Sequence, residues 1–286
     1  MKNLKAITAL FITISLLFFV SCLKDEEGRT SQDEINELAD YLAANDINTV
    51  PTWTGLYYLE DSVGIGVKPE YNDTVVIEFH ASLLDGTIIG SSDLTGEAVT
   101  FNLWDWDIIL GLSEAISYTN EGGKARAIIP SPLAFGAYSS GAIQPYSTLL
   151  YDFELIEVRP GNPVEPYPEE DSSFHTTNSG LQYYIVEQSE GEAVQTGNSV
   201  TIHYTGYLSG GKIFDSSVKR EIPIVFTVGV GNMIPGFDEG LLLMKLGEKF
   251  RFILSPDLAY GEQGNFPVIP PNSTITFDVE LLEIMN

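Results

Sequence analysis

Val200-Thr201-Ile202-His203-Tyr204-Thr205-Gly206 opens the stretch of sequence that decides the fold, which runs on to Phe277. Four more blocks follow it: Phe214-Asp215-Ser216-Ser217, Ile234-Pro235-Gly236-Phe237, Leu258-Ala259-Tyr260-Gly261 and Ile269-Pro270-Pro271-Asn272-Ser273. Aromatic and branched apolar residues dominate the blocks, and few polar groups stand among them. We therefore predict one apolar cleft with aromatic walls.

The residues in and around these blocks predict a sheet and one short helix. Phe237, Leu241 and Met244 fall at i, i+4 and i+7, which predicts a helix over 237–244 with one face on a sheet, entered through a turn at Pro235-Gly236. Runs of β-branched and aromatic residues predict strands over 181–187, 200–208, 224–228, 249–254 and 274–284. The fold class is therefore α+β, an antiparallel β-sheet wrapped around a short helix.

The order and spacing of the five blocks resemble the FKBP-type peptidyl-prolyl cis/trans isomerases over residues 174–286. The resemblance implies an enzyme that accelerates rotation about X-Pro bonds in proline-containing polypeptides. It also implies FK506-like macrolides as ligands. Rotation of an amide needs no nucleophile, acid, base, metal or cofactor, and none is expected.

The resemblance also assigns roles to single residues. The catalytic pocket of the family falls on Tyr204, Phe214, Asp215, Phe237, Tyr260 and Phe277, with Phe237 as the floor where the family usually has tryptophan. Asp215 is the polar anchor, and the Tyr260 hydroxyl donates to the substrate backbone. The substrate-binding positions are Phe226 as a wall, Met233 and Ile234 at the rim, Val268 and Ile269 in the rim loop, and Arg220 as the partner of Asp215.

Residues 50–158 repeat the pattern. Ser91-Ser92 lies 125 residues before Ser216-Ser217, and Leu133-Ala134-Phe135-Gly136 lies 125 residues before Leu258-Ala259-Tyr260-Gly261. This offset predicts a second copy of the same fold, whose pocket positions hold Phe79, Ile89, Gly90, Leu112 and Phe135. These residues lack the carboxylate and the phenol hydroxyls. We infer a degenerate FKBP-like domain that serves as an interaction, spacing or dimerisation module.

A Pro-rich linker, residues 159–173, separates the two copies, with prolines at Pro160, Pro163, Pro166 and Pro168. Prolines at this density favour extended polyproline conformation. At about 3.1 Å per residue the linker could hold the domains up to roughly 40 Å apart.

Residues 22–49 form a tether and a short helix before the first copy. Ser31-Gln32-Asp33-Glu34 has the form of a capping box, and Ile35, Leu38 and Leu42 follow at helical spacing. We expect this helix to pack on its own domain, with a dimer-forming helix as the alternative.

Residues 1–21 have the pattern of a signal peptide. Lys2 and Lys5 precede an apolar run over 6–20, and a small residue, Ser21, comes before Cys22. The cysteine makes the segment resemble a bacterial lipoprotein signal, cleaved before Cys22 and lipidated on its sulfur. We therefore expect an outer membrane lipoprotein that faces the periplasm or the cell surface. An uncleaved anchor is the alternative, although a spanning helix needs about 20 residues.

Composition excludes several function classes. The net charge is −26, with 14 basic and 40 acidic residues, which argues against nucleic-acid binding. Cys22 is the one cysteine, so no intrachain disulfide forms. His80, His175 and His203 share no metal-ligand spacing, and no metal is expected.

Two functional hypotheses are compatible with these sequence features. The first is a prolyl isomerase that assists the folding of exported proteins, with its active site in the second domain. The alternative is a non-enzymatic chaperone or binding module that uses the FKBP-like clefts. A weaker hypothesis is a sugar platform formed by Trp53, Trp104 and Trp106. The client proteins and the oligomeric state are left open.

Overall fold

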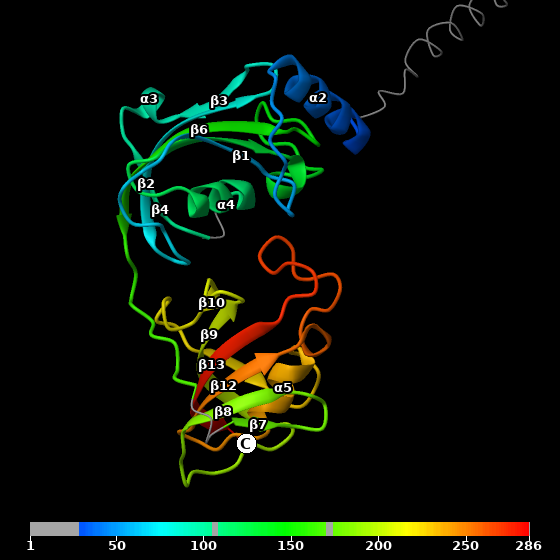
Figure 1. Ribbon diagram of the computed structural model, residues 1–286. Coiled ribbons are helices and arrows are strands. Elements are labelled where there is room, and N and C mark those ends of the chain that lie inside the picture. The colour runs from blue at the N-terminus through cyan, green and yellow to red at the C-terminus, as the bar shows by residue number, and fades with distance from the viewer. Residues whose placement is uncertain (1–28, 105–107, 170–173, 286) are drawn as a thin grey trace, which may run out of the picture.

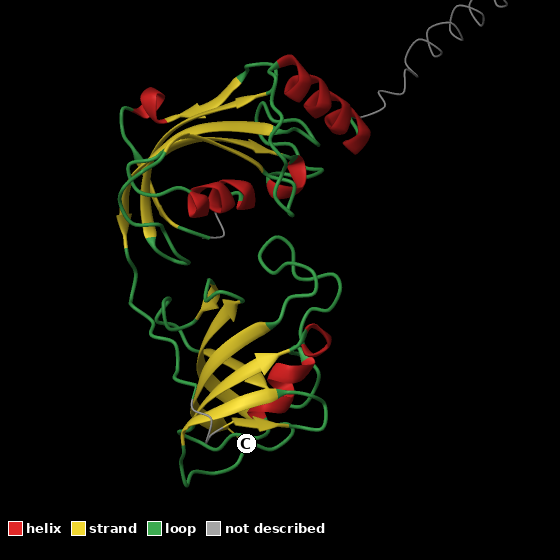
Figure 2. Ribbon diagram, viewed as in Figure 1, coloured by secondary structure: helices red, strands yellow, loops and turns green. Residues whose placement is uncertain are grey.

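The computed structural model describes residues 29–104, 108–169 and 174–285 (Figure 1). The predicted signal peptide, residues 1–21, lies outside the described residues, as do Cys22 and Trp106. The chain forms two domains, each an antiparallel β-sheet with a short helix against it (Figure 2). The predicted α+β class with two domains of one fold is confirmed. Within the described ranges, no helix combines the length and apolar character needed to cross a membrane.

The first domain holds a sheet of order β1-β5-β6-β2-β3, with β4 paired to β2. Helix α4, Leu110–Tyr118, packs under this sheet, and the one-turn helix α3, Ser92–Thr95, follows β3 (Figure 1). The strands are β1 (Tyr57–Ser62), β2 (Thr74–Leu83), β3 (Ile88–Ser91), β4 (Val99–Asn102), β5 (Lys124–Ile129) and β6 (Leu149–Arg159).

The second domain repeats this order as β10-β9-β13-β12-β8, with β7 added at the β8 edge and β11 paired to β9. The strands are β7 (Phe174–Thr176), β8 (Gln182–Glu187), β9 (Ser199–Leu208), β10 (Ile213–Ser216), β11 (Ile224–Thr227), β12 (Lys249–Leu254) and β13 (Ile275–Met285). The predicted strands agree with β8, β9, β11, β12 and β13 to within one residue at each end.

Helix α5, Pro235–Leu241, begins two residues earlier than predicted and ends three residues earlier. Pro235-Gly236 is its first turn and not a turn before it, because proline suits the first helical position, where its missing N–H is not needed. Phe237, Leu241 and Met244 are nevertheless all buried, as the helical spacing predicts. The helix thus lays its apolar face on the sheet and fixes one wall of the cleft.

Alternation along β9 shows why this sequence forms a strand against a core. Val200, Ile202 and Tyr204 point into the core, and their exposed fractions are 0%, 0% and 9%. Thr201 and His203 lie between them and are only partly buried. Tyr204, a residue of the cleft, therefore lies on the same face of this central strand as the core residues.

Helix α2, Ser31–Ala44, departs from its predicted cap. Thr30 is the N-cap and forms the capping box with Asp33, so Ser31 and Glu34 do not. Glu34 is instead buried, and its carboxylate accepts hydrogen bonds from Ser131 N at 2.6 Å and Thr148 Oγ1 at 2.8 Å. The helix therefore packs on its own domain, as expected, but through a carboxylate, while Ile35 is 58% exposed.

The linker runs along one side of the molecule from the end of β6 to the second domain (Figure 1). Gly161 N donates to Asp73 in the first domain at 3.0 Å, and Asn162 Nδ2 donates to Glu221 in the second domain at 2.6 Å. Further along, Tyr167 N donates to Asp278 at 2.8 Å. The linker could have held the domains up to roughly 40 Å apart, but the domains contact each other directly, as in the hydrogen bond from Tyr71 to Asp215.

Candidate functional site

A cleft of about 530 Å³ opens in the second domain between helix α5 and the sheet. Strand β9 supplies one wall residue, β10 two, β13 one, and the segment leading into α5 supplies the rim. The lining residues are Tyr204, Phe214, Asp215, Ile224, Asn232, Met233, Ile234, Pro235, Phe237, Tyr260 and Phe277. The structure thus brings together all six residues of the predicted catalytic pocket, with Met233 and Ile234 beside them.

Aromatic rings in edge-to-face contact form the bottom of the cleft. Phe237 is 1% exposed, and its ring lies 4.8 Å from that of Phe277 at 67°. Phe214 meets Phe277 at 5.6 Å and 83°, and Tyr204 meets Phe237 at 6.2 Å and 75°. Such pairs stabilise each other beyond simple burial and hold the rings at fixed angles. The bottom of the cleft is therefore a continuous apolar surface of packed aromatic rings.

Gly206 on β9 makes room for this arrangement. A Cβ atom at this position would lie 2.5 Å from the Phe214 ring and 2.9 Å from the Phe277 ring. Two aromatic side chains therefore occupy the space that any other residue would fill. The last residue of the opening sequence block is thus required by the cleft wall.

One polar network lies at the edge of the apolar cleft, around Asp215. Its carboxylate accepts hydrogen bonds from the Tyr204 hydroxyl and from Arg220, with which it forms an ion pair. The Tyr71 hydroxyl of the first domain donates to the same carboxylate at 3.1 Å. Arg220 also donates to the Tyr204 hydroxyl at 3.3 Å. Arg220 therefore pairs with Asp215 as expected, while Tyr71 was not anticipated.

Burial sets the protonation of this network. It raises the pKa of the Tyr204 hydroxyl above 10.0, and the nearby Asp215 charge adds to the effect. The pKa of Tyr260 is also raised, first by burial and then by Asp215. Burial alone would lower the pKa of Arg220, but its hydrogen bond and ion pair with Asp215 raise it. The tyrosines are thus neutral donors and Arg220 is a cation near neutral pH.

Two further side chains hold the backbone of the cleft in place. Ser217 Oγ accepts from Tyr204 N at 2.7 Å and donates to Tyr204 O at 3.1 Å, which fixes β10 against β9. Asp238 in the first turn of α5 accepts from Gly229 N at 2.6 Å and from Gly231 N at 3.3 Å. Asp238 therefore anchors the loop that carries Met233 to the rim.

Four predicted substrate-binding residues lie outside the cleft lining. Phe226 packs behind the floor, 6.2 Å from the Phe237 ring, and Arg220 acts through Asp215. Val268 faces a cavity between the two domains. Ile269 is 2% exposed, so it is a core residue and not part of the rim. Ile224, Asn232 and Pro235 take places in the lining that the sequence did not assign.

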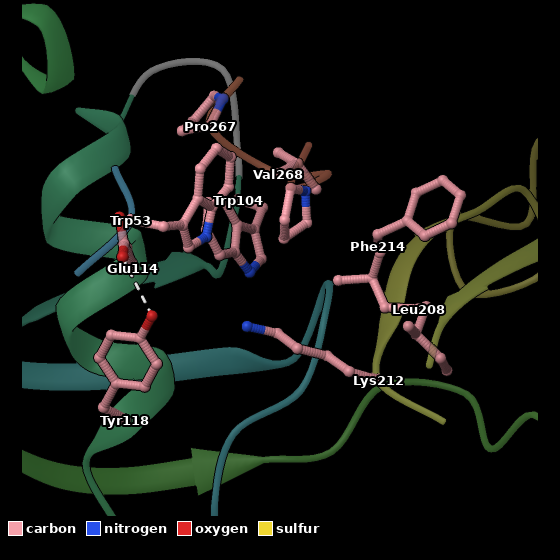
Figure 3. A pocket seen from close by; sticks show the side chains of 11 residues that line it. Trp53, Trp104, Glu114, Tyr118, Leu208, Lys212, Phe214, Pro267 and Val268 are labelled. Carbon is pink, nitrogen blue, oxygen red and sulfur yellow. Dashed lines mark hydrogen bonds between the residues drawn. The ribbon is translucent and has the colours of Figure 1, made fainter. Parts of the chain in front are cut away.

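The interdomain cavity, of about 60 Å³, lies next to the cleft wall (Figure 3). Lys212, after the β9–β10 turn, extends its ammonium group toward the rings of Trp104 and Tyr118, at 5.9 and 5.7 Å from their centroids. The Tyr118 hydroxyl donates to Glu114 at 3.0 Å. Trp53 packs edge-on against Phe266 at 6.0 Å. Trp53 and Trp104 therefore face the second domain and do not form an open sugar platform.

The described residues contain no cluster of histidine, cysteine and acidic side chains with the geometry of a metal site. The cleft instead offers an apolar surface with neutral hydroxyl donors and one compensated carboxylate at its edge. A planar amide is more polar than a twisted one, so such a surface favours the twisted form. The arrangement can therefore lower the barrier of roughly 18–20 kcal/mol to rotation about an X-Pro bond.

Several known proteins are similar to part of this chain. FK506-binding protein 1 of Rhizopus delemar is 56% identical over 106 residues, 37% of this chain and 98% of that protein. A probable FKBP-type peptidyl-prolyl cis-trans isomerase of Haemophilus influenzae is 48% identical over 109 residues, which are 38% of this chain and 44% of its own length. The crystal structure of FkpA from Escherichia coli matches at a TM-score of 0.38 and 42% identity, covering 41% of this chain and 53% of that one.

Two segments of the chain match a family model. They span residues 66–156 and 190–282, so that each domain contributes one of them. The model describes the FKBP-type peptidyl-prolyl cis-trans isomerases, the family that the spacing of the sequence blocks also resembles. The chain therefore belongs to the FKBP-type peptidyl-prolyl cis-trans isomerase family.

Proposed function

We propose that the second domain catalyses cis-trans isomerisation of X-Pro bonds in polypeptides and that the first domain has no such activity. The observation that carries the proposal is the cleft of about 530 Å³ over Phe237, edged by Asp215 and Tyr260. A prolyl ring lies on the Phe237 floor, and the apolar walls withdraw the imide from water. The twisted transition state is then favoured over the planar ground state.

The residues of the first domain support the second half of the proposal. Phe79 and Gly90 stand where the second domain has Tyr204 and Asp215, and Phe135 stands where it has Tyr260. A cleft built from these residues has neither the carboxylate nor the phenol hydroxyls. Substrate backbone atoms would find no side-chain hydrogen-bond partner at these positions.

An isomerase assay on the full chain tests the proposal. Turnover of a proline peptide is measured by a protease-coupled assay or by NMR exchange, for the wild type and for Asp215→Val and Tyr260→Phe. We expect kcat/KM to fall about tenfold in Asp215→Val, since a half-buried, hydrogen-bonded charge at the edge of the cleft is lost. The matched control is Phe135→Leu in the first domain, which should leave kcat/KM unchanged. Wild-type turnover equal to the uncatalysed rate would rule the function out.

The cellular role follows from the N-terminal pattern and is also a proposal. Residues 1–21 and Cys22 have the order of a lipoprotein signal, so we propose a lipid-anchored isomerase of the outer membrane that acts on exported polypeptides. Mass spectrometry of the purified native protein tests it. Diacylglyceryl-cysteine as the first residue is the expected result, and an unmodified Cys22 would contradict it.

Ligand binding to the cleft gives a test that does not depend on turnover. We propose that FK506-like macrolides bind over Phe237, as the names of several relatives suggest for those proteins. Titration with FK506 should show saturable binding that Phe237→Ala abolishes. Binding retained in that variant would place the ligand elsewhere.

A further inference from the structure

The turn that precedes β2 in the first domain reaches the active-site network of the second. Tyr71 donates its hydroxyl to Asp215 Oδ1 at 3.1 Å, although the two residues are 144 positions apart in sequence. Arg220 donates to the same hydroxyl, and its guanidinium carbon lies 5.8 Å from the centre of the Tyr71 ring. Tyr71 thus contacts both members of the ion pair at the edge of the cleft.

Contacts of the two residues that follow Tyr71 hold it in this place. Lys219 Nζ forms an ion pair with Asp73 Oδ1 at 3.1 Å, and the two side chains are 4% and 5% exposed. Asn72 Nδ2 donates to the Lys219 carbonyl at 3.1 Å. Buried charges are seldom found without a partner, so this ion pair fixes the position of the turn against the second domain. The position of Tyr71 is therefore fixed by its two following neighbours.

The linker also helps to hold this turn in place. Asp73 Oδ1 also accepts from Gly161 N at 3.0 Å, and Asn162 Nδ2 donates to Glu221 at 2.6 Å. The segment that joins the domains is thus tied to the turn that bears Tyr71 and to the turn that follows Asp215. Each of these contacts acts to keep the Tyr71 hydroxyl at the edge of the cleft.

We propose that Tyr71 is a positioning residue for the active site of the second domain. Burial and the Asp215 charge raise its pKa to about 12, so it remains a donor near neutral pH. It supplies Asp215 with a hydrogen bond in addition to those from Tyr204 and Arg220, and restricts the carboxylate to one orientation. The domain that lacks pocket chemistry thereby completes the pocket of its neighbour. This inference rests on the isomerase activity proposed above.

The test is Tyr71→Phe in the full-length chain, which removes the hydroxyl and keeps the ring beside Arg220. We expect kcat/KM to fall about fivefold, the usual effect of one hydrogen bond. Tyr138→Phe is the matched control, because Tyr138 belongs to the same domain and is 79% exposed. An unchanged kcat/KM in Tyr71→Phe would overturn the proposal.

A double-mutant cycle distinguishes positioning from a general loosening of the interface. If Tyr71 acts through Asp215, Tyr71→Phe has no further effect on kcat/KM in an Asp215→Asn background. An equal fall in both backgrounds would show that it acts in another way and would overturn the proposal.

NMR separates this proposal from the activity on which it rests. The Arg220 side-chain N–H signal should shift in Tyr71→Phe and stay in place in Tyr138→Phe, whether or not the protein turns over peptide. A wild type without turnover would refute the proposed function, while an unshifted Arg220 signal would refute the role of Tyr71.

Discussion

Ser92 in the first domain and Ser217 in the second make the same pair of hydrogen bonds. Ser92 Oγ accepts from Phe79 N at 3.0 Å and donates to Phe79 O at 3.3 Å, and Ser217 does the same for Tyr204 at 2.7 and 3.1 Å. The side chains carried by these anchored residues differ by one hydroxyl. Both domains thus have the serine hydrogen bonds that hold the backbone, but only the second has the tyrosine hydroxyl in its cleft.

The two domains also differ in how the helix packs on the sheet. Gly240 of α5 lies against the ring of Phe252, where a Cβ would come within 2.8 Å. The corresponding positions in the first domain, 125 residues earlier, hold Ala115 and Ala127, both fully buried. In the second domain an aromatic ring of the sheet fills the space beneath Phe237, and the helix residue facing that ring is a glycine. The fold thus tolerates two ways of filling its core, and the Phe237 floor rests on the aromatic one.

The largest effect should come from removing the floor. Phe237→Ala should lower kcat/KM about 100-fold, which corresponds to a loss of roughly 3 kcal/mol of transition-state stabilisation. Leu112→Ala, at the matching position of the first domain, should destabilise that domain by about 2–5 kcal/mol and leave kcat/KM nearly unchanged. Peptide turnover is measured under conditions where circular dichroism shows both variants to be folded. A Leu112→Ala variant as impaired as Phe237→Ala would break the distinction between the domains.

A smaller effect is expected at Gly206 and at Ala81, the matching residue of β2. Gly206→Ala should displace the Phe214 ring, lower kcat/KM about tenfold and destabilise the protein by about 1–3 kcal/mol. Ala81→Gly should cost about 0.5–1 kcal/mol of stability and no activity. Urea unfolding and the peptide assay measure both. The closest clash is with Phe214 at 2.5 Å, and Phe277 follows at 2.9 Å, so Gly206→Ala should cost less stability in a Phe214→Leu background than in the wild type. An equal or larger cost in that background would contradict the steric explanation.

The smallest effect concerns alkaline pH. The Tyr204 pKa is raised in the folded protein, mainly by burial, so as pH rises past about 10 the unfolded chain loses this proton first. The unfolded state then binds fewer protons, and the free energy of unfolding falls by up to about 1.4 kcal/mol per pH unit for each such tyrosine. Tyr204→Phe, which installs the residue of the first domain, should lessen this decline. Denaturant unfolding at a series of pH values tests it, and equal slopes for both proteins would refute it.

Local pattern was enough to predict much of the second domain. Alternation predicted β9 with Tyr204 on the core side, and helical spacing predicted the buried face of α5 with Phe237. Both signals repeat every two or about four residues, so neighbouring positions reveal them. The cap of α2 was misplaced by one residue because Thr30–Asp33 and Ser31–Glu34 both fit a capping box. Burial of Glu34 by partners about 100 positions away decided between them.

The amino-acid sequence by itself determined that there are two domains of one fold, which of them keeps the polar pocket residues, and, except for Phe226, which aromatic rings form the cleft. Only the tertiary structure decided that Ile269 is core, that the linker is tied to both domains, and that Tyr71 meets Asp215. The physical reason is the separation in sequence between the residues that make contact. Periodicity and motif spacing record contacts within a strand, a helix or a repeated unit, whereas a contact between two domains depends on how their surfaces fit and leaves no periodic trace in either sequence.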